Sequence, residues 1–274
     1  MIKIEMRNER EAASLFYRFQ STPFTKGLEA SQQENLLQIH CSGSKQQISH
    51  IAFLLSEHVI CEHEERMLLT LIYSTFYFQD ADEQEQILAV AKSIIQGEKP
   101  EIPGVKQLSS RSSILFDTFY HYLLDEKTLP FESFLRFRLK PYRECLLRYV
   151  EMAIDEYKLE QDYQTFVETL RKLLKQRGPL LDTVHVVYNG EFFLYDQHDN
   201  RIDEMGLRKR LEPIFQTSWG LHSEPSLLLT LIGIAPKKIF LYTDETDIGM
   251  IQTIQNVFQE RLEIFPSRRS HFHS

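Results

Sequence analysis

Cysteine, glycine, proline and long apolar runs are all scarce in this sequence. Its 274 residues include only three cysteines, ten glycines and ten prolines, which excludes disulfide scaffolds, collagen-like chains and low-complexity disorder. Cys41, Cys61 and Cys145 are odd in number and form no CxxC pair, so we expect reduced thiols in a cytoplasmic protein. The longest apolar run, Leu227–Ala235, is too short to span a bilayer, so we expect no membrane span.

The short motifs that identify common enzyme classes are missing as well. The sequence contains no GxGxxG, no GxxxxGK[ST] and no GxSxG, which removes the usual anchors of dinucleotide, P-loop and hydrolase sites. His63-Glu64 begins like the zinc motif HExxH, but Met67 stands where the second histidine belongs. The charged first ten residues lack the apolar core of a secretion signal. These absences leave no recognisable catalytic motif, and we expect neither a cofactor nor a metal.

The residues that are present predict an α+β fold that is mainly α. A 42% hydrophobic and 26% charged composition is ordinary for a globular protein. Residues 1–61 show alternating strands and amphipathic helices, which predict a small β-α-β-α unit. Its predicted elements are strand Ile2–Met6, helix Glu9–Phe19, strand Leu36–His40 and helix Lys45–Cys61.

Residues 62–178 read as one helical domain. Their predicted helices are Glu64–Phe78, Gln84–Gln96, Ser109–Leu124 and a long periodic run from Pro141 to the Gly178-Pro179 stop. A pattern this long is more typical of two packed helices than of one. Its apolar stripe thins at Glu156–Gln164, which we therefore predict to be the joint between them.

Residues 179–274 predict a C-terminal α/β unit that begins with a β-hairpin. Asn189-Gly190 lies between Thr183–Tyr188 and Glu191–Asp196, the spacing of a two-residue hairpin turn. The remaining predicted elements are helices Asp203–Phe215 and Glu224–Ile234, strand Lys238–Tyr242, helix Thr246–Glu260 and strand Leu262–Phe265. The last three elements form a β-α-β order, which favours parallel strands joined by a right-handed crossover.

A basic and aromatic cluster is the best candidate site. The eighteen residues Phe131–Arg148 hold five basic residues and only two acidic ones, with aromatic residues between them. Arginine forks suit carboxylates and phosphates, and aromatic rings can stack on bases. The predicted binding residues are Arg136, Arg138, Lys140, Tyr142 and Arg143. The alternative is internal pairing of this cluster with the nine acidic residues of segment 62–101.

Two further clusters could hold a metal ion, and each has a simpler interpretation. The residues of the first cluster could share one face of a helix; they are His58, Cys61, Glu62 and Glu65. The simpler interpretation is the end of an amphipathic helix with solvated acids. The second follows strand Lys238–Tyr242, at the edge where α/β folds bind ligands. Asp244 and Asp247 could bind Mg²⁺ there, but we expect Thr246 or Asp247 to cap the next helix instead.

Three stretches resemble the YtxC-like family of sporulation proteins from spore-forming bacteria. They are FESFLRFRLKPYRECLLRYVEMAIDEYKLEQDYQTFVETLRKLL at 131–174, the acidic segment Tyr73–Ile94, and IAPKKIFLYTDE at 234–245. The resemblance implies a cytoplasmic sporulation protein without assigned catalytic residues. We therefore expect a non-enzymatic protein that acts by binding a protein partner. The alternatives are a nucleic-acid or phosphate-binding protein, which the net charge of −8 disfavours, and a metal-dependent enzyme of the C-terminal unit.

Overall fold

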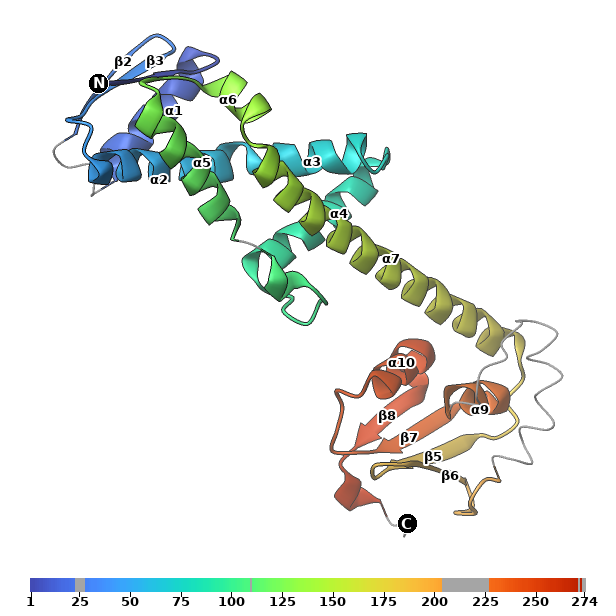
Figure 1. Ribbon diagram of the computed structural model, residues 1–274. Coiled ribbons are helices and arrows are strands. Elements are labelled where there is room, and N and C mark those ends of the chain that lie inside the picture. Colours follow the sequence, from blue (N-terminus) through green and yellow to red (C-terminus); the bar gives the residue numbers. More distant parts are fainter. Residues whose placement is uncertain (23–27, 109, 204–226, 271, 273–274) are drawn as a thin grey trace. The chain divides into compact units, whose positions relative to one another are not determined.

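The computed structural model describes residues 1–22, 28–108, 110–203, 227–270 and 272 (Figure 1). The chain divides into two compact units, Met1–Leu159 and Glu160–Ser274, and each has its own hydrophobic core. Each unit combines helices with a four-stranded sheet, so the predicted α+β class with mainly helical content is confirmed. In the described part of the chain, no helix has the length and apolar character needed to cross a membrane.

The first unit contains a sheet with the strand order β2-β3-β1-β4. The strands are β1 (Ile2–Glu5), β2 (Glu29–Gln33), β3 (Leu36–His40) and β4 (Thr128–Pro130). Strand β1 pairs antiparallel with β3 and parallel with β4. The predictions of β1 and β3 are confirmed, whereas β2 and β4 were not predicted. Both are edge strands without a strong alternating apolar pattern, and Pro130 suits such an edge.

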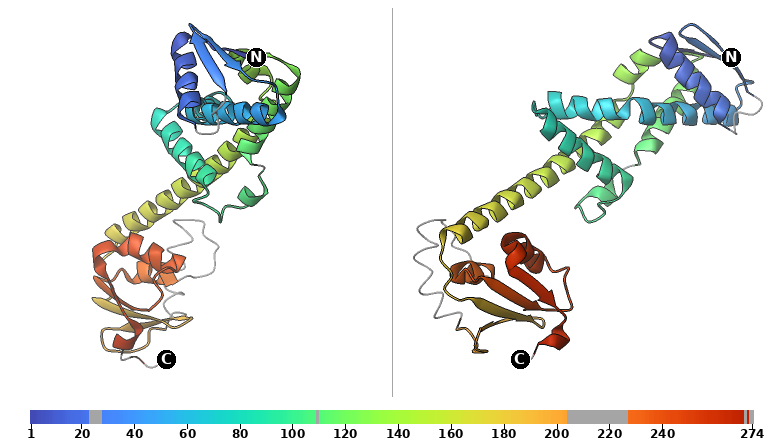
Figure 2. Two further views of the ribbon diagram at one scale, coloured as in Figure 1. Left: turned by 90° about the vertical axis from the view of Figure 1, so that its left-hand side faces the viewer. Right: turned by 180° about the vertical axis from the view of Figure 1, so that it is seen from behind.

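The helices of the first unit pack partly on this sheet and partly on one another (Figure 2). They are α1 (Glu9–Ser21), α2 (Lys45–Glu62), α3 (Glu64–Ser74), α4 (Ala81–Gln96), α5 (Arg111–Asp125) and α6 (Phe131–Phe137), with a short 3-10 turn η2 (Val105–Gln107). The buried strand residues Ile2, Ile4, Leu37, Ile39 and Leu129 join the helices in one core. Side chains of Asn8, Ser44, Asp80 and Ser110 accept hydrogen bonds from first-turn amides, which explains where four of these helices begin.

Helix α7 (Lys140–Gln176) is continuous, so the prediction of a joint at Glu156–Gln164 is wrong. No glycine or proline interrupts the helix after Pro141, so nothing in the backbone ends it there. The apolar stripe thins because the helix contributes to two separate cores. Ala153 and Ile154 belong to the core of the first unit, and the next buried residue, Val167, belongs to the second.

The second unit contains a sheet with the order β6-β5-β7-β8. Its strands are β5 (Thr183–Tyr188), β6 (Phe192–Asp196), β7 (Lys238–Tyr242) and β8 (Leu262–Phe265), with helices α9 (Leu227–Ile234) and α10 (Gly249–Phe258) and 3-10 turns η3 (Gln259–Arg261) and η4 (Ser267–Arg269). The antiparallel β5–β6 hairpin and the parallel β7–β8 pair confirm the predictions. The predicted helix Asp203–Phe215, beyond its first residue, and residues 224–226 lie outside the described residues.

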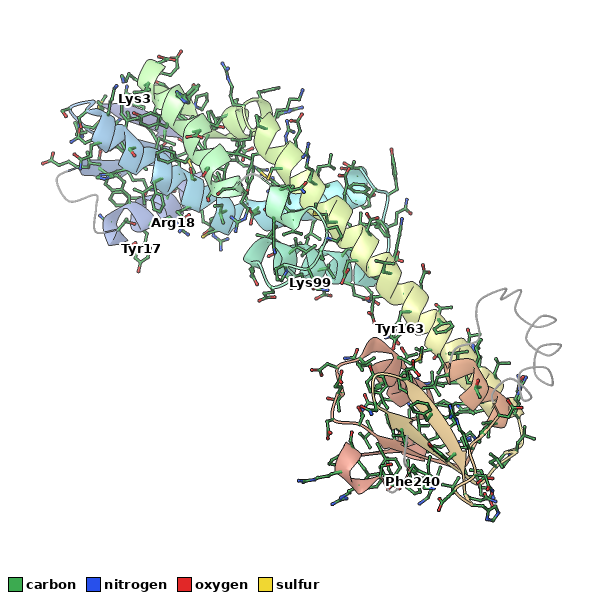
Figure 3. All side chains as sticks on the ribbon, turned by 60° about the horizontal axis from the view of Figure 1, so that its bottom comes forward. Lys3, Tyr17, Arg18, Lys99, Tyr163 and Phe240 are labelled. Atoms are coloured by element: carbon green, nitrogen blue, oxygen red, sulfur yellow. The ribbon has the colours of Figure 1, made fainter. Side chains whose placement is uncertain are left out.

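The C-terminal end of α7 is part of the second core. Val167, Leu170 and Leu174 pack with buried residues of α9, α10 and the sheet. Tyr163, labelled in Figure 3, accepts a hydrogen bond from Nδ2 of Asn256 on α10 at 2.8 Å. Arg171 donates to the Asn256 carbonyl at 2.6 Å from Nη2, so polar contacts reinforce the apolar packing.

Candidate functional site

The basic cluster lies on α6 and the first turn of α7. Helix α6 buries Phe131, Phe134 and Leu135 against the core. The helical period directs the basic residues of α6 and of the first turn of α7 outward, together with Phe137, and all of them are exposed. We call this set the basic surface; it contains Arg136, Phe137, Arg138, Lys140 and Arg143.

Contacts within the basic surface are local. Nη2 of Arg143 donates to the Arg136 carbonyl at 3.0 Å, and the Arg136 guanidinium lies 5.4 Å from the ring centre of Phe137. The Phe137 side chain is 70% exposed, which is unusual for a phenylalanine. Nζ of Lys140 lies 3.8 Å from the exposed Glu144 carboxylate, and a pair of this kind contributes little stability.

Tyr142, also predicted to bind, is buried instead of exposed. Its hydroxyl donates to Oε2 of Glu64, and Nε of Arg111 lies 3.5 Å from the same oxygen. Burial, followed by the nearby Glu64 carboxylate, raises the pKa of Tyr142, so the phenol stays protonated. The tyrosine therefore supports the fold beneath the basic surface and is not part of that surface.

The acidic segment 62–101 forms its ion pairs elsewhere. Glu62 lies 4.0 Å from Arg18, Glu64 lies 3.5 Å from Arg111, and Glu65 lies 2.6 Å from Lys92. Among the described residues, no ion pair joins this segment to Arg136, Arg138, Lys140 or Arg143. The basic surface is therefore not paired with the acidic segment 62–101, which was the alternative that the sequence left open.

A hollow of about 440 Å³ borders the basic surface. Its lining includes three arginines and nearby hydroxyl groups: Arg66, Arg136, Arg143, Thr70, Ser74 and Thr75. Glu132 also lines it, so the positive charge is in excess. Arg138 instead borders a separate hollow beside Asp117, Asp125 and Glu126, where neighbouring carboxylates offset its charge.

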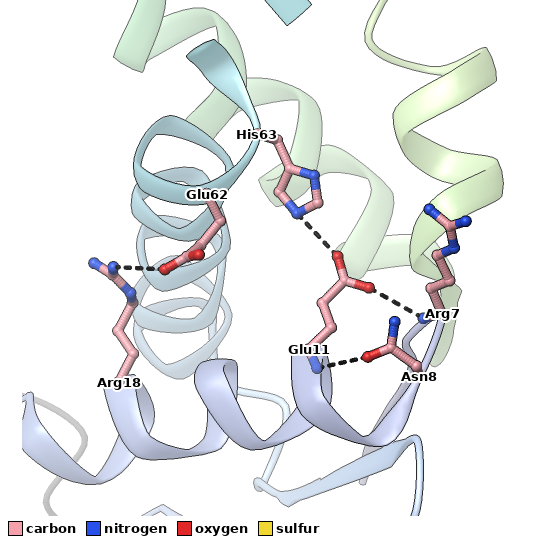
Figure 4. A network of polar contacts seen from close by, with 6 residues as sticks. All are labelled: Arg7, Asn8, Glu11, Arg18, Glu62 and His63. Carbon is pink, nitrogen blue, oxygen red and sulfur yellow. Dashed lines mark hydrogen bonds and ion pairs between the residues drawn. The ribbon is translucent and has the colours of Figure 1, made fainter. Parts of the chain in front are cut away.

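A third hollow, of about 480 Å³, lies between α1 and the junction of α2 with α3, and Figure 4 shows polar contacts of residues in and beside it. Asn8 caps α1 by accepting from the Glu11 amide at 2.9 Å. Oε2 of Glu11 accepts from the Arg7 amide at 3.3 Å, and Oε1 lies 3.0 Å from Nε2 of His63. His63 is the residue at which α2 ends and α3 begins, and this break turns its ring toward Glu11.

His58 of α2 lies behind this contact. Its ring is completely buried and lies 5.6 Å from the His63 ring and 5.7 Å from the Phe131 ring, between ring centres. Burial, then the charges of His63 and Arg18, lower the pKa of His58 from 6.5 to about 4. Burial also lowers the pKa of His63, although the Glu11 carboxylate acts in the opposite direction. Both imidazoles are consequently neutral at pH 7, the form that binds metals.

One donor atom from each of Glu11, His58 and His63 lies within 4.8 Å of the others, and this is the group in the described part of the chain that could hold a metal ion. Sequence reasoning selected His58 but not its partners. Glu11 is distant in sequence, and His63 follows His58 by five residues, so a regular helix would not place them together. The break between α2 and α3 and the packing of α1 beside it bring the three side chains together.

The first cluster that the sequence offered as a possible metal site, around His58 and Cys61, is not brought together as a group. Cys61 is exposed, Glu62 lies beside Arg18, and Glu65 pairs with Lys92. None of the three belongs to the close group of Glu11, His58 and His63, although Glu62 lines the same hollow.

The C-terminal acids have structural contacts of another kind. Oδ1 of Asp244 accepts from the Ser267 amide at 3.2 Å. The prediction that Thr246 or Asp247 caps the following helix is wrong, because α10 begins at Gly249 and Ile248 occupies the cap position without a side-chain hydrogen bond. The prediction failed because the helix begins two residues after Asp247.

Comparison with known proteins places the chain among similar sequences. The sequence profile of the YtxC-like family matches residues 49–263. An uncharacterized protein YtxC from Bacillus subtilis (strain 168) is 40% identical over 206 residues, which cover 75% of this chain and 72% of that protein. No solved structure matches the chain. The matched range includes the basic surface, His58 and His63, whereas Glu11 precedes it.

Proposed function

We propose that this chain, which belongs to the YtxC-like family, acts by binding an acidic segment of a partner protein through the basic surface. The role is non-enzymatic, in the cytoplasm of sporulating cells; the sporulation setting rests on the sequence resemblance. The observation that carries the proposal is the position of Arg136 and Arg143. Both are exposed, both line the same hollow as Arg66, and their guanidinium groups are not paired with the acidic segment 62–101.

The chemistry of this surface suits carboxylates. A guanidinium can form two parallel hydrogen bonds with one carboxylate, and three such groups line one hollow. The exposed ring of Phe137 offers an apolar contact next to Arg136. Aromatic and arginine side chains are also the types that carry most binding energy in protein interfaces. A short peptide with acidic and apolar residues would match both features.

The overall charge favours a short acidic peptide over a long polyanion. The chain carries a net charge of −8, so an extended nucleic acid would meet repulsion away from the basic surface. A short segment experiences chiefly the local arginines, because the Debye length is about 8 Å at physiological ionic strength. Protein binding is therefore the preferred reading, and nucleic-acid binding is the alternative outcome of the test.

The experiment places a photo-crosslinking amino acid at Phe137 of the full chain in sporulating cells. Tyr17, a similarly exposed aromatic residue at 74%, carries the same crosslinker as the matched control. We expect Phe137 to capture a peptide rich in Asp and Glu that Tyr17 does not capture. A synthetic copy of this peptide should bind the purified chain, and Arg136→Gln with Arg143→Gln should weaken binding at least tenfold.

Arg148→Gln is the control substitution, because Arg148 is an exposed arginine of α7 that does not line the hollow. It should leave both peptide affinity and spore count unchanged, and all variants should melt like the original chain. A captured peptide without acidic residues, or equal affinity in the double variant, would refute the proposal. Salt-dependent binding of RNA or DNA that the double variant loses would replace it with the nucleic-acid reading.

A further inference from the structure

We infer that Glu11, His58 and His63 form a binding site for one divalent transition-metal ion of the zinc type. The three residues come from α1, from α2 and from the junction of α2 with α3. Their donor atoms lie within 4.8 Å of one another. The inference does not depend on the proposed partner-binding function, because its three ligands are not part of the basic surface, although His63 lines both hollows.

The buried ring of His58 is the first observation that points to a ligand. Both of its nitrogens are buried, and neither has a hydrogen-bond partner in the part of the chain that the structure describes. Buried polar groups nearly always have a partner, so an imidazole without one requires an explanation. A metal ion bound to one nitrogen would supply that partner.

The contact between Glu11 and His63 is the second observation. Their Oε1 and Nε2 atoms lie 3.0 Å apart, yet Nε2 does not have the orientation of a hydrogen bond. A metal ion bound to both atoms would supply the partner that the buried Nε2 of His63 lacks. The other oxygen of Glu11 accepts from the Arg7 amide, which holds the carboxylate in place as supporting contacts do in metal sites.

The donor set selects the class of ion. Two imidazole nitrogens and one carboxylate suit zinc and neighbouring transition metals, whereas calcium and magnesium prefer oxygen ligands alone. Ligand atoms of a tetrahedral zinc site are about 3.3 Å apart. The separation of 3.0 Å between Glu11 and His63 is close to this value, and small side-chain adjustments bring the group to it. The Glu11 side chain, which is long and 15% exposed, can make this adjustment.

The hollow around the cluster leaves room for a further ligand. The hollow has a volume of about 480 Å³, and its lining also includes three arginines and two further acids: Arg7, Arg10, Arg66, Glu62 and Glu132. The two additional carboxylates offset part of the arginine charge that would repel a cation. An ion with three protein ligands keeps a fourth position open, unlike the closed four-ligand arrangement of structural zinc sites.

The experiment titrates the full chain with Zn²⁺ by calorimetry and with Co²⁺ by visible absorption. All proteins carry His271→Gln and His273→Gln, because these two histidines in the last four residues could bind metal themselves. We expect one ion per chain, a Co²⁺ spectrum that reports nitrogen and oxygen ligands, and a higher melting temperature with Zn²⁺. Glu11→Gln, His58→Gln and His63→Gln should each weaken binding at least tenfold.

Matched controls separate ligation from general effects. Glu9→Gln removes an exposed acid of the first turn of α1, and His121→Gln removes an exposed histidine of α5. Glu9 precedes Glu11 by two residues, so its side chain lies on another face of α1. Both control variants should bind metal like the parent chain. If His58→Gln does not fold, Glu11→Gln decides the question, since its side chain is only at the rim of the cluster. Absence of binding in the parent chain, or equal affinity in the folded Glu11→Gln and His63→Gln variants, would overturn the inference.

Discussion

The hydroxyl of Tyr142 on α7 donates a hydrogen bond to the carboxylate of Glu64 on α3, 78 residues earlier in the chain. Both residues are buried, and Arg111 of α5 lies beside the same carboxylate oxygen. One buried acid thus connects three helices beneath the basic surface. Its charge is tolerated because it has both a hydrogen-bond donor and a cation nearby.

Tyr142→Phe should destabilise the first unit by about 1–3 kcal/mol, because it leaves part of a buried carboxylate unsatisfied. The loss should appear in urea unfolding followed by circular dichroism. Tyr122→Phe is the control, since the Tyr122 hydroxyl bonds the Thr128 carbonyl at an exposed position. Equal stability of the Tyr142→Phe variant and the original chain would show that this hydrogen bond is unimportant.

Gln161→Pro should reduce stability by about 3 kcal/mol and lower the helical signal, because proline removes a backbone hydrogen bond and clashes with the preceding turn. Gln161 is exposed within the continuous helix α7, so side-chain packing should contribute little. Gln161→Ala, which keeps the backbone donor, should be neutral or slightly stabilising. A harmless proline at this position would instead support the two-helix interpretation.

The three cysteines should react with iodoacetamide in the order Cys61, Cys41, Cys145. Cys61 is exposed, Cys41 half-buried and Cys145 buried, and none of the three is in a disulfide. Burial raises the pKa of the Cys145 thiol, so at a given pH less of it is the reactive thiolate. Raising the pH from about 7 to about 9 should speed labelling while Cys145 remains slowest. Mass spectrometry of the labelled peptides gives the order.

In denaturant all three thiols should react equally fast, because burial no longer protects any of them. The native labelling order would be contradicted if Cys145 reacted first. A disulfide detected in protein purified under alkylating, non-reducing conditions would contradict the expectation of reduced thiols.

Local sequence patterns were sufficient for most secondary structure. Strand Leu36–His40, the Asn189-Gly190 hairpin and the parallel pair of β7 and β8 follow from alternation and turn chemistry, which act between near neighbours. Strands β2 and β4 were not predicted, because β2 is polar and β4 is short. Both are edge strands that form by pairing with β3 and β1, respectively. The thinning of the apolar stripe in α7 was visible in the sequence, but its cause, two separate cores, was not.

For the candidate sites too, some features follow from the sequence and others only from the tertiary structure. The sequence by itself determined which residues of FESFLRFRLK are apolar and buried and which are basic and exposed, because helical period and hydrophobicity are local properties. Only the tertiary structure decided that Tyr142 is buried on Glu64, and that Glu11, His58 and His63 converge. Those relationships join side chains from separate helices, and their distances depend on how the helices pack and where α2 breaks. No local pattern contains that information.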